Sequence, residues 1–195
     1  AISSDSEIIL DTVRKHYEVD LVKRPTNFAR DDSPIEEALI HTLEILEREQ
    51  EYKADIVVWM QPNVPIRKHG VIDTTIENLL NNPDADSSVT CFEVTQIPEA
   101  MKKMNEKGRL VSLYDDVTSI RRQEFAKRFL LDGSVNAFRA DLLFKNRGIR
   151  KLHIYLGKEI IPVVQKKRMY SLELDELEDV SLLKYYWNQN LSQRQ

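Results

Sequence analysis

Apolar residues recur along this chain in two alternating patterns, short continuous runs and stripes with helical spacing. Continuous runs bounded by turn residues predict strands, here at 20–22, 56–60, 88–94, 133–138, 160–164 and 170–175. Helical patterns predict helices over about 71–81, 140–145 and 176–190, and a further one that starts at Ser33-Pro34 and has Ile35, Ala38, Leu39, Leu43 and Leu46 on one face. Strands that alternate with helices are typical of βαβ units, so the pattern predicts an α/β fold with a mostly parallel sheet.

The first residues look like the end of a strand that runs into a helix. The stretch Ser4-Asp5-Ser6-Glu7 fits a capping box ahead of the apolar residues Ile8, Ile9 and Leu10. Because a domain rarely begins at the last residues of a strand, we expect a further N-terminal segment ahead of Ala1.

The pattern changes between residues 95 and 127, where the chain is polar and interrupted. Lysines and arginines are frequent there, and one apolar strand, from Leu110 to Tyr114, follows a turn at Lys107-Gly108. This arrangement predicts an antiparallel hairpin that leaves the main sheet. The hairpin is either a solvated surface feature or an arm that docks on a second subunit.

The composition is that of an ordinary globular protein, with 42% hydrophobic and 31% charged residues in a chain of 195. The net charge of −4 argues against nonspecific nucleic-acid binding. Cys91 is the single cysteine, which excludes a disulfide framework and a thiolate metal site and fits a reducing compartment. No apolar stretch approaches a membrane span and no signal-peptide pattern opens the chain, so we expect a cytoplasmic protein with no membrane partner.

The run Gln61-Pro62-Asn63-Val64-Pro65-Ile66-Arg67 follows the predicted strand at 56–60 and is the most informative part of the chain. We expect that strand to be a buried one in the parallel sheet. Because ligands of open α/β sheets bind outside the carboxyl ends of the strands, the loop stands where a site is expected. Its two prolines restrict the backbone, so the loop would present Gln61 and Arg67 from a rigid frame. The alternative is a proline-rich turn with no chemistry.

A second candidate lies near the C-terminal end, at Glu173-Leu174-Asp175. In a strand, residues two apart point to the same side, so both carboxylates would face one way. Such a pair can hold Mg²⁺, which prefers oxygen ligands. The alternative is that Asp175 and Glu178 cap the last helix. The four histidines lack metal-ligand spacing, and the sequence has neither a Gly-x-Ser-x-Gly elbow nor a Walker loop.

Taken in their order along the chain, these and shorter motifs resemble the acylneuraminate cytidylyltransferase family, which includes the CMP-N-acetylneuraminate synthetases. The motifs are Ser4-Asp5-Ser6-Glu7, Arg24-Pro25, Asp31-Asp32-Ser33, Ile40-His41, the Gln-Pro-x-x-Pro-x-Arg run at 61–67, Arg122-Gln123, Asp132-Gly133 and Ser171-x-Glu173-x-Asp175. The resemblance covers residues 1–195 as a single domain, with 95–127 as an inserted arm. It implies a Rossmann-like, three-layer nucleotide-diphospho-sugar transferase fold.

The resemblance also implies an activity. CTP and a nine-carbon 2-keto sugar acid would give a CMP-sugar and pyrophosphate with the help of Mg²⁺, and members usually form a homodimer through the arm. Candidate substrate-binding residues follow from it: Arg24, Ser33, Gln61, Arg67, Arg122 and Gln123. Arg24 and the neighbourhood of Ser33 match the cytidine pocket, and Gln61 matches a residue that faces the sugar acid. Arg122 matches an arginine that approaches the sugar carboxylate, often from the partner subunit.

Glu173 and Asp175 match the family's paired aspartates that hold Mg²⁺, and they are the candidate catalytic and metal-binding residues. The chain departs from the family pattern at Leu130, at Asn136, at Glu173 itself and in having no counterpart of the opening strand and triphosphate loop. Two alternatives therefore stay open. One is a catalytically inactive dimeric homologue that acts as a binding or structural domain, and the other is a synthetase for a 3-deoxy-octulosonate type of acid.

Overall fold

The computed structural model describes residues 1–114 and 121–192, apart from the side chains of Arg122 and of residues 190–192. The described chain forms two compact units. Unit 1 comprises Ala1–Trp59, Thr75–Ser88 and Asn136–Ile161, and unit 2 comprises Met60–Thr74, Val89–Val135 and Pro162–Gln195.

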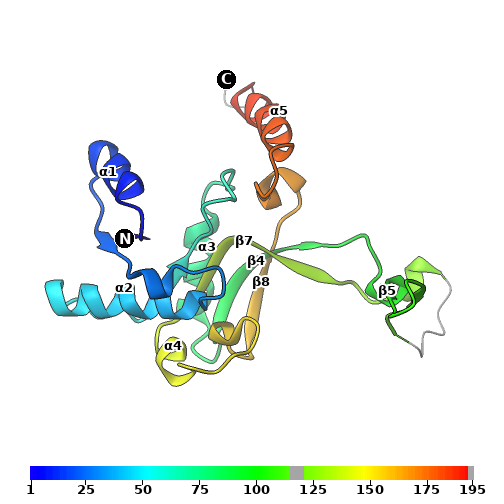
Figure 1. Cartoon of the computed structure of the whole chain (residues 1–195), viewed down its shortest axis with the longest axis horizontal. Helices are drawn as coiled ribbons and strands as arrows, with labels where there is room; N and C mark the ends of the chain where they lie inside the picture. The colour runs from blue at the N-terminus through cyan, green and yellow to red at the C-terminus, as the bar shows by residue number, and fades with distance from the viewer. Residues whose placement is uncertain (115–120, 193–195) are drawn as a thin grey trace. The chain divides into compact units, whose positions relative to one another are not determined.

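Unit 1 begins with a small parallel sheet and a helix that packs on it (Figure 1). β1 (Ile2–Ser4) pairs with β2 (Leu21–Lys23), and α1 (Glu7–His16) contacts both strands. The helix begins where the Ser6 hydroxyl accepts a hydrogen bond from the Ile9 amide. The predicted helix start is therefore present, but its cap is Ser6 and not Ser4, whose hydroxyl accepts a bond from the Ser6 amide instead.

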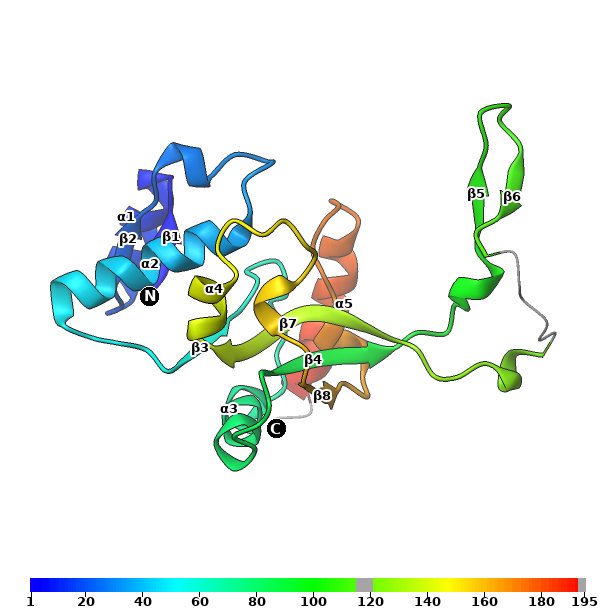
Figure 2. The ribbon, with the colours of Figure 1, turned by 90° about the horizontal axis from the view of Figure 1, so that it is seen from below.

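The central sheet has four strands in the order β3–β7–β4–β8 (Figure 2). Their bounds are Ile56–Trp59 for β3, Phe129–Arg139 for β7, Ser87–Glu93 for β4 and Ile160–Val164 for β8. β7 runs antiparallel to β3, with Val57 opposite Phe138. The strand predicted at 56–60 is thus present, but the expectation that it is a buried parallel strand is wrong. It stands at the end of the strand order and its residues are half-buried.

The remaining pairings set the direction of the sheet. β7 is antiparallel to β4 as well, since the Arg139 amide at the end of one donates to the Asp86 carbonyl at the start of the other at 3.1 Å. β8 is parallel to β4, because the Asp86 amide donates to the Glu159 carbonyl and the Gln165 amide donates to the Cys91 carbonyl. β3, β4 and β8 therefore share one direction and β7 runs against them, so the four-stranded sheet is mostly parallel in strand direction, as the alternating pattern predicts.

Helices of unit 1 complete its core. α2 (Ile35–Gln50) contacts the short helices η1 (Thr26–Phe28) and α4 (Asp141–Lys145), and α4 contacts η4 (Ile154–Leu156). α3 (Val71–Asn81) contributes Leu79 to a buried cluster with Ala85 and Ala137, against which Ile56, Val58 and Ile161 pack. The strands and helices thus bury one apolar cluster between them, as a layered α/β fold requires.

The start of α2 differs from its prediction. Pro34 occupies the cap position and makes no side-chain cap bond. The Ser33 hydroxyl instead accepts a bond from the Arg30 amide at 3.1 Å and donates to the Asn27 carbonyl at 2.9 Å. Ser33 closes the turn ahead of the helix, because its hydroxyl finds backbone partners there first.

Unit 2 contains the hairpin and the last helix. β5 (Lys102–Met104) pairs antiparallel with β6 (Leu110–Ser112), which confirms the predicted hairpin (Figure 2). It is flanked by η2 (Pro98–Ala100) and η3 (Arg122–Glu124), and residues 115–120 of the predicted 95–127 arm lie outside the described residues. α5 (Asp179–Ser192) is the predicted last helix and begins three residues later than expected.

The predicted strand at 170–175 is wrong. The chain forms η5 (Arg168–Ser171) and then an irregular segment that leads to α5. The amides of Asp175 and Glu176 donate to the Asp179 carboxylate, at 3.0 and 2.8 Å, and not to a neighbouring strand.

Among the described residues, no helix has both the length and the apolar character that a membrane crossing needs.

Candidate functional site

The Gln61–Arg67 loop follows β3 and is anchored within unit 2. The Gln61 amide donates to the Gly133 carbonyl of β7 at 3.1 Å. Val64 and Ile66 are buried, with 0% and 2% of their surface exposed. Because two of its side chains lie in the core, the loop is a fixed part of the unit, as its prolines predict.

The side chain of Gln61 lies directly over Gly133. A Cβ atom at Gly133 would stand 2.5 Å from both Cδ and Oε1 of Gln61, and the φ angle of Gly133 is +62°. The positive φ favours glycine at this position, and any larger residue would have to displace the end of the Gln61 side chain. The Asp132-Gly133 motif of the sequence is what lets Gln61 approach β7 closely.

The Arg67 side chain bonds to protein backbone. Its Nε donates to the Ser134 carbonyl at 2.9 Å, and its Nη2 donates to the Gln61 carbonyl at 2.6 Å. Burial lowers the pKa of Arg67, and the charge of Asp132 opposes that shift. Arg67 thus joins the end of its loop to β7 and to the start of the same loop, while its predicted contact with a substrate stays a prediction.

Asn63 joins this loop to the acidic segment at 173–175. Its Nδ2 donates to Asp175 Oδ1 at 2.8 Å, across a separation of 112 positions in the sequence. Its backbone carbonyl accepts a bond from the Leu174 amide, also at 2.8 Å. The Asp175 carboxylate therefore faces the loop, and it does not act as the helix cap that the alternative interpretation of this segment required. The structure brings Gln61, Asn63 and Asp175 into one region of unit 2.

Glu173 is half-buried beside two other carboxylates. Burial raises its pKa above the ordinary value, and the charges of Asp175 and Asp132 raise it further. A hydrogen bond with the Asp175 carboxyl group acts in the same direction. Because the ionised carboxylates of Glu173 and Asp175 repel each other, binding of a proton or of a cation is favourable at Glu173.

Asp132 has no predicted role, yet the structure places it among these groups. It is fully buried at 0% exposure. Its Oδ1 accepts bonds from the Thr90 hydroxyl and from the Ser134 amide, and its Oδ2 accepts one from the Ser171 hydroxyl at 2.8 Å. An acidic residue directly before a glycine, in a run that is otherwise strand-like, is the sequence signal that could have found it, since a buried carboxylate needs donors around it.

Cys91 lies on β4 in the same unit. Only 2% of its surface is exposed, and burial, assisted by the charge of Asp132, raises the pKa of its thiol. The thiolate is the reactive form of cysteine, so a covered and protonated thiol is a poor nucleophile. The structure gives Cys91 a packing role.

The carboxylates fit a magnesium ion only as a pair. Among the residues that the structure describes, no group of three or more His, Cys, Asp and Glu side chains is arranged to hold a metal ion. Mg²⁺, however, is usually held by one or two carboxylates together with substrate phosphates and water. Glu173 and Asp175 suit that mode, because their mutual repulsion, which raises the pKa of Glu173, is relieved by a cation.

Arg24 and Ser33, the predicted cytidine-binding residues, both belong to unit 1. Arg24 follows β2, and its Nη2 lies 3.6 Å from Asp5 Oδ1. Its buried Nε finds no hydrogen-bond partner among the described residues. The Ser33 hydroxyl is hydrogen-bonded within the turn before α2. Arg24 Nε, in contrast, is a donor that no described protein group accepts.

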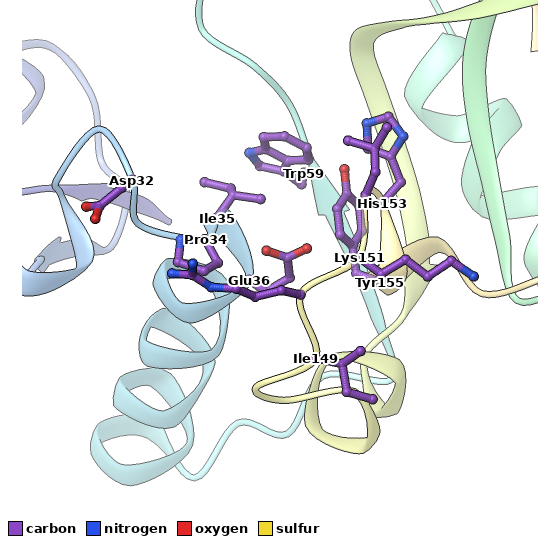
Figure 3. A pocket seen from close by; sticks show the side chains of 11 residues that line it. Asp32, Pro34, Ile35, Glu36, Trp59, Ile149, Lys151, His153 and Tyr155 are labelled. Carbon is purple, nitrogen blue, oxygen red and sulfur yellow. The ribbon is translucent and has the colours of Figure 1, made fainter.

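A hollow of about 430 Å³ lies within unit 1, and its lining includes Asp32 and Pro34, the two sequence neighbours of Ser33 (Figure 3). Its walls come from the start of α2, from Trp59 at the end of β3 and from the segment 149–155. The rings of Trp59 and Tyr155 meet edge to face at 5.7 Å. Burial and the charge of Glu36 raise the pKa of Tyr155, so its phenol stays protonated. The hollow offers an aromatic wall, a phenol and a carboxylate to a planar polar ligand.

Arg122 and Gln123 lie in η3 of unit 2. Gln123 is exposed, and the side chain of Arg122 is outside the described residues. Their contacts with a sugar acid therefore stay predictions.

Replacing Gly133 tests the approach of Gln61. Gly133→Ala is expected to lower the free energy of unfolding by about 1–3 kcal/mol, because the new Cβ meets the Gln61 side chain and the positive φ strains any L residue. Gly108→Ala is the matched control, since its φ is +68° but an added Cβ meets nothing within 4 Å. Urea denaturation compares the two, and equal losses would show that Gln61 does not press on Gly133.

The raised pKa of Glu173 predicts a pH-dependent effect on stability. The folded state favours the protonated form, so this contribution is full at low pH and is lost as the pH rises through the raised pKa. Glu173→Gln is therefore expected to raise the melting temperature at pH 7 by a few degrees, roughly 2–4 °C per kcal/mol for a chain of this size, and to change little near pH 4. The exposed Glu178→Gln is the control. A gain that is equal at both pH values would contradict the assigned cause.

No protein-family model and no curated protein matches the sequence. Solved structures do match it. One is a CMP:2-keto-3-deoxy-manno-octonic acid synthetase complexed with CTP, which is 14% identical, has a TM-score of 0.61, and is matched over 96% of this chain and 80% of that one. Another is a 4-diphosphocytidyl-2C-methyl-D-erythritol synthase from Anaerococcus prevotii DSM 20548, with 12% identity, a TM-score of 0.59, and coverage of 94% of this chain and 77% of that one. The chain therefore has the α/β fold with a mostly parallel central sheet that these nucleotide-diphospho-sugar transferase-like structures share.

Proposed function

We propose that this protein transfers cytidine monophosphate from CTP to a nonulosonic, sialic-acid-like sugar acid and releases pyrophosphate. The fold supports nucleotidyl transfer in general, because one structural neighbour is a CMP-sugar synthetase bound to CTP and the other is named for a diphosphocytidyl product. The choice of a nine-carbon acid rests on the sequence resemblance, chiefly on the Gln-Pro-x-x-Pro-x-Arg run.

One observation carries the proposal, namely the bonding of Asn63 to the acidic segment. The loop and the two carboxylates are far apart in the sequence, and a shared site needs them together. The bond from Asn63 to Asp175 and the bond from Leu174 to Asn63 bring them together within one unit. A bland proline-rich turn would have no reason to hold a carboxylate in this way.

The reaction places clear demands on these residues. The hydroxyl oxygen on the anomeric carbon of the acid would bond to the α-phosphorus of CTP in line while its proton passes to water, the bond from that phosphorus to the oxygen bridging to the β-phosphate would break, and pyrophosphate would leave. The Gln61 side chain would donate a hydrogen bond to the sugar acid and accept one from it, and so would orient the acid beside the α-phosphate. Glu173 and Asp175 would hold Mg²⁺, and the bound ion supplies positive charge opposite the phosphate oxygens. Asn63 keeps Asp175 turned toward the loop.

Taken by itself, the hollow of unit 1 has the groups that a cytosine base would need. Cytosine is planar and carries an amino donor and carbonyl and ring-nitrogen acceptors. The Glu36 carboxylate and the protonated Tyr155 phenol are complementary to those groups, and Trp59 offers an aromatic wall (Figure 3).

A second candidate is a synthetase for a 3-deoxy-octulosonate type of acid. The CTP-bound neighbour is equally compatible with this candidate and with the first. A third is a dimeric homologue without catalysis, which the departures at Leu130 and Asn136 motivate. The structure gives Asn136 a place inside the sheet, at 2% exposure and opposite Trp59, while Leu130 is 55% exposed.

An assay of pyrophosphate release separates these candidates. The protein expressed from its complete reading frame is incubated with CTP, Mg²⁺ and one acid at a time: sialic, legionaminic, pseudaminic or 3-deoxy-octulosonic acid. Release with a nine-carbon acid is the expected result, and release with the octulosonate alone would replace it with the second candidate. No release with any acid would count for the inactive homologue.

Asp175→Asn belongs in the same assay. Loss of one carboxylate from the pair is expected to lower turnover by about a hundredfold or more at saturating CTP. The exposed Glu178→Gln removes the same charge three residues away and is expected to keep activity. Melting temperatures of both variants show whether the loss is one of catalysis or of stability.

We propose in addition that the 95–127 arm joins two copies of the chain. Met104 and Leu110 are direct cross-strand partners of the hairpin, and they are 70% and 69% exposed. Two large apolar side chains next to each other on an exposed hairpin are typical of a surface that another protein covers.

The dimer has its own test. Met104→Asp together with Leu110→Asp is expected to shift the protein from dimer to monomer in sedimentation velocity runs at micromolar concentration, because charges replace the apolar pair. Lys103→Asp is the control, since adjacent strand positions face opposite sides of the hairpin. A wild-type protein that sediments as a monomer would reject the proposal directly.

A further inference from the structure

Asp132 is bonded through both of its carboxylate oxygens, and the two oxygens reach different parts of unit 2. On one side are the Thr90 hydroxyl and the Ser134 amide, which belong to the sheet. On the other is the hydroxyl of Ser171, the last residue of η5. A fully buried carboxylate is destabilising unless its donors are in place, so this position specifies its neighbours strictly.

The segment from Ser171 to Asp175 is held at two points. Its first residue is bonded to Asp132 on β7, and its last two are bonded to Asn63. No strand pairing supports the residues between these points, since the segment is irregular. The position of the Glu173 carboxylate therefore depends on these two attachments, together with the burial of Leu172, which is 7% exposed, and the bond from the Asp175 amide to Asp179.

The same stretch of β7 holds the other half of the site. The Gly133 carbonyl accepts the Gln61 amide, and the Ser134 carbonyl accepts Arg67 Nε. Residues 132–134 thus attach the Gln61 loop through backbone carbonyls and the acidic segment through the Asp132 side chain. A shift of Asp132 would move the two halves relative to each other.

We propose that Asp132 is a positioning residue, which acts through Ser171 to set where the Glu173 and Asp175 carboxylates stand relative to Gln61. Its kinetic consequence rests on the proposed function, and its structural consequence rests on the geometry alone. Reacting groups must be held close to their productive positions, and a displacement of about 1 Å can lower the rate by roughly a hundredfold.

Two variants each remove one side-chain bond to Asp132. Ser171→Ala cuts the link to the acidic segment, whereas Thr90→Val cuts bonds inside the sheet, to Asp132 and to the backbone of Val135, and keeps nearly the same volume. We expect Ser171→Ala to lower kcat by about tenfold to a hundredfold with the KM for CTP changed by less than about twofold. Thr90→Val is expected to lose stability but to keep kcat, and Ser171→Thr, which keeps the hydroxyl, is expected to retain activity.

Hydrogen exchange of the Leu174 amide supplies a readout that needs no turnover. This amide is bonded to the Asn63 carbonyl, so release of the segment should speed its exchange in Ser171→Ala and leave it unchanged in Thr90→Val. If exchange responds as expected but the wild type has no activity with any acid, the positioning role stands and the proposed function fails. Equal effects of the two variants on exchange and on kcat, or no effect of Ser171→Ala on either, would overturn the role of Asp132.

Discussion

The candidate site depends on the hydrogen bonds between Asn63 and the acidic segment, which Asn63 makes with both its backbone and its side chain. A residue that accepts through its carbonyl and donates through its amide sets the orientation of a partner as well as its distance. Asn63 stands next to Pro62 and directly before Val64, which is completely buried. The irregular segment therefore takes its rigidity from a loop that is rigid for reasons of its own.

The polar groups around β7 show how this arrangement is maintained. Asp132 on β7 and Thr90 on the neighbouring β4 are both fully covered and bonded to each other, in a position where apolar side chains would pack more simply. Polar networks inside a protein tolerate few alternatives, because each unpaired group is destabilising. A network of this kind exchanges some stability for a defined geometry, which is what a site built from distant segments needs.

The sequence predicted the elements well and their partners less well. Strands at 56–60 and 160–164 and the helix at 71–81 were predictable to within a residue, because burial shapes the apolar pattern locally. Whether β3 has parallel or antiparallel neighbours depends on β7, about 80 positions later, and no local pattern encodes that choice.

The errors in the site have similar causes. Leu172 and Leu174 alternate with Glu173 and Asp175, and this period of two predicts a strand. In the structure the Leu174 amide is instead bonded to the carbonyl of Asn63, in a loop. The structure brings the Gln61–Arg67 loop to the acidic segment through the bond from Asn63 to Asp175, while the roles of Gln61 and Asp175 stay predictions. Asp132 belongs to the Asp132-Gly133 motif but has no predicted role, because its partners Thr90 and Ser171 lie 42 and 39 positions away.

The covered thiol of Cys91 has a practical consequence. It lies on β4 with its pKa raised, so reagents that attack thiolates can reach it only when that strand separates from its neighbours. Cys91 is the single cysteine of the sequence, so the rate at which a thiol reagent labels the protein measures how often the middle of the sheet opens. No engineered probe is needed.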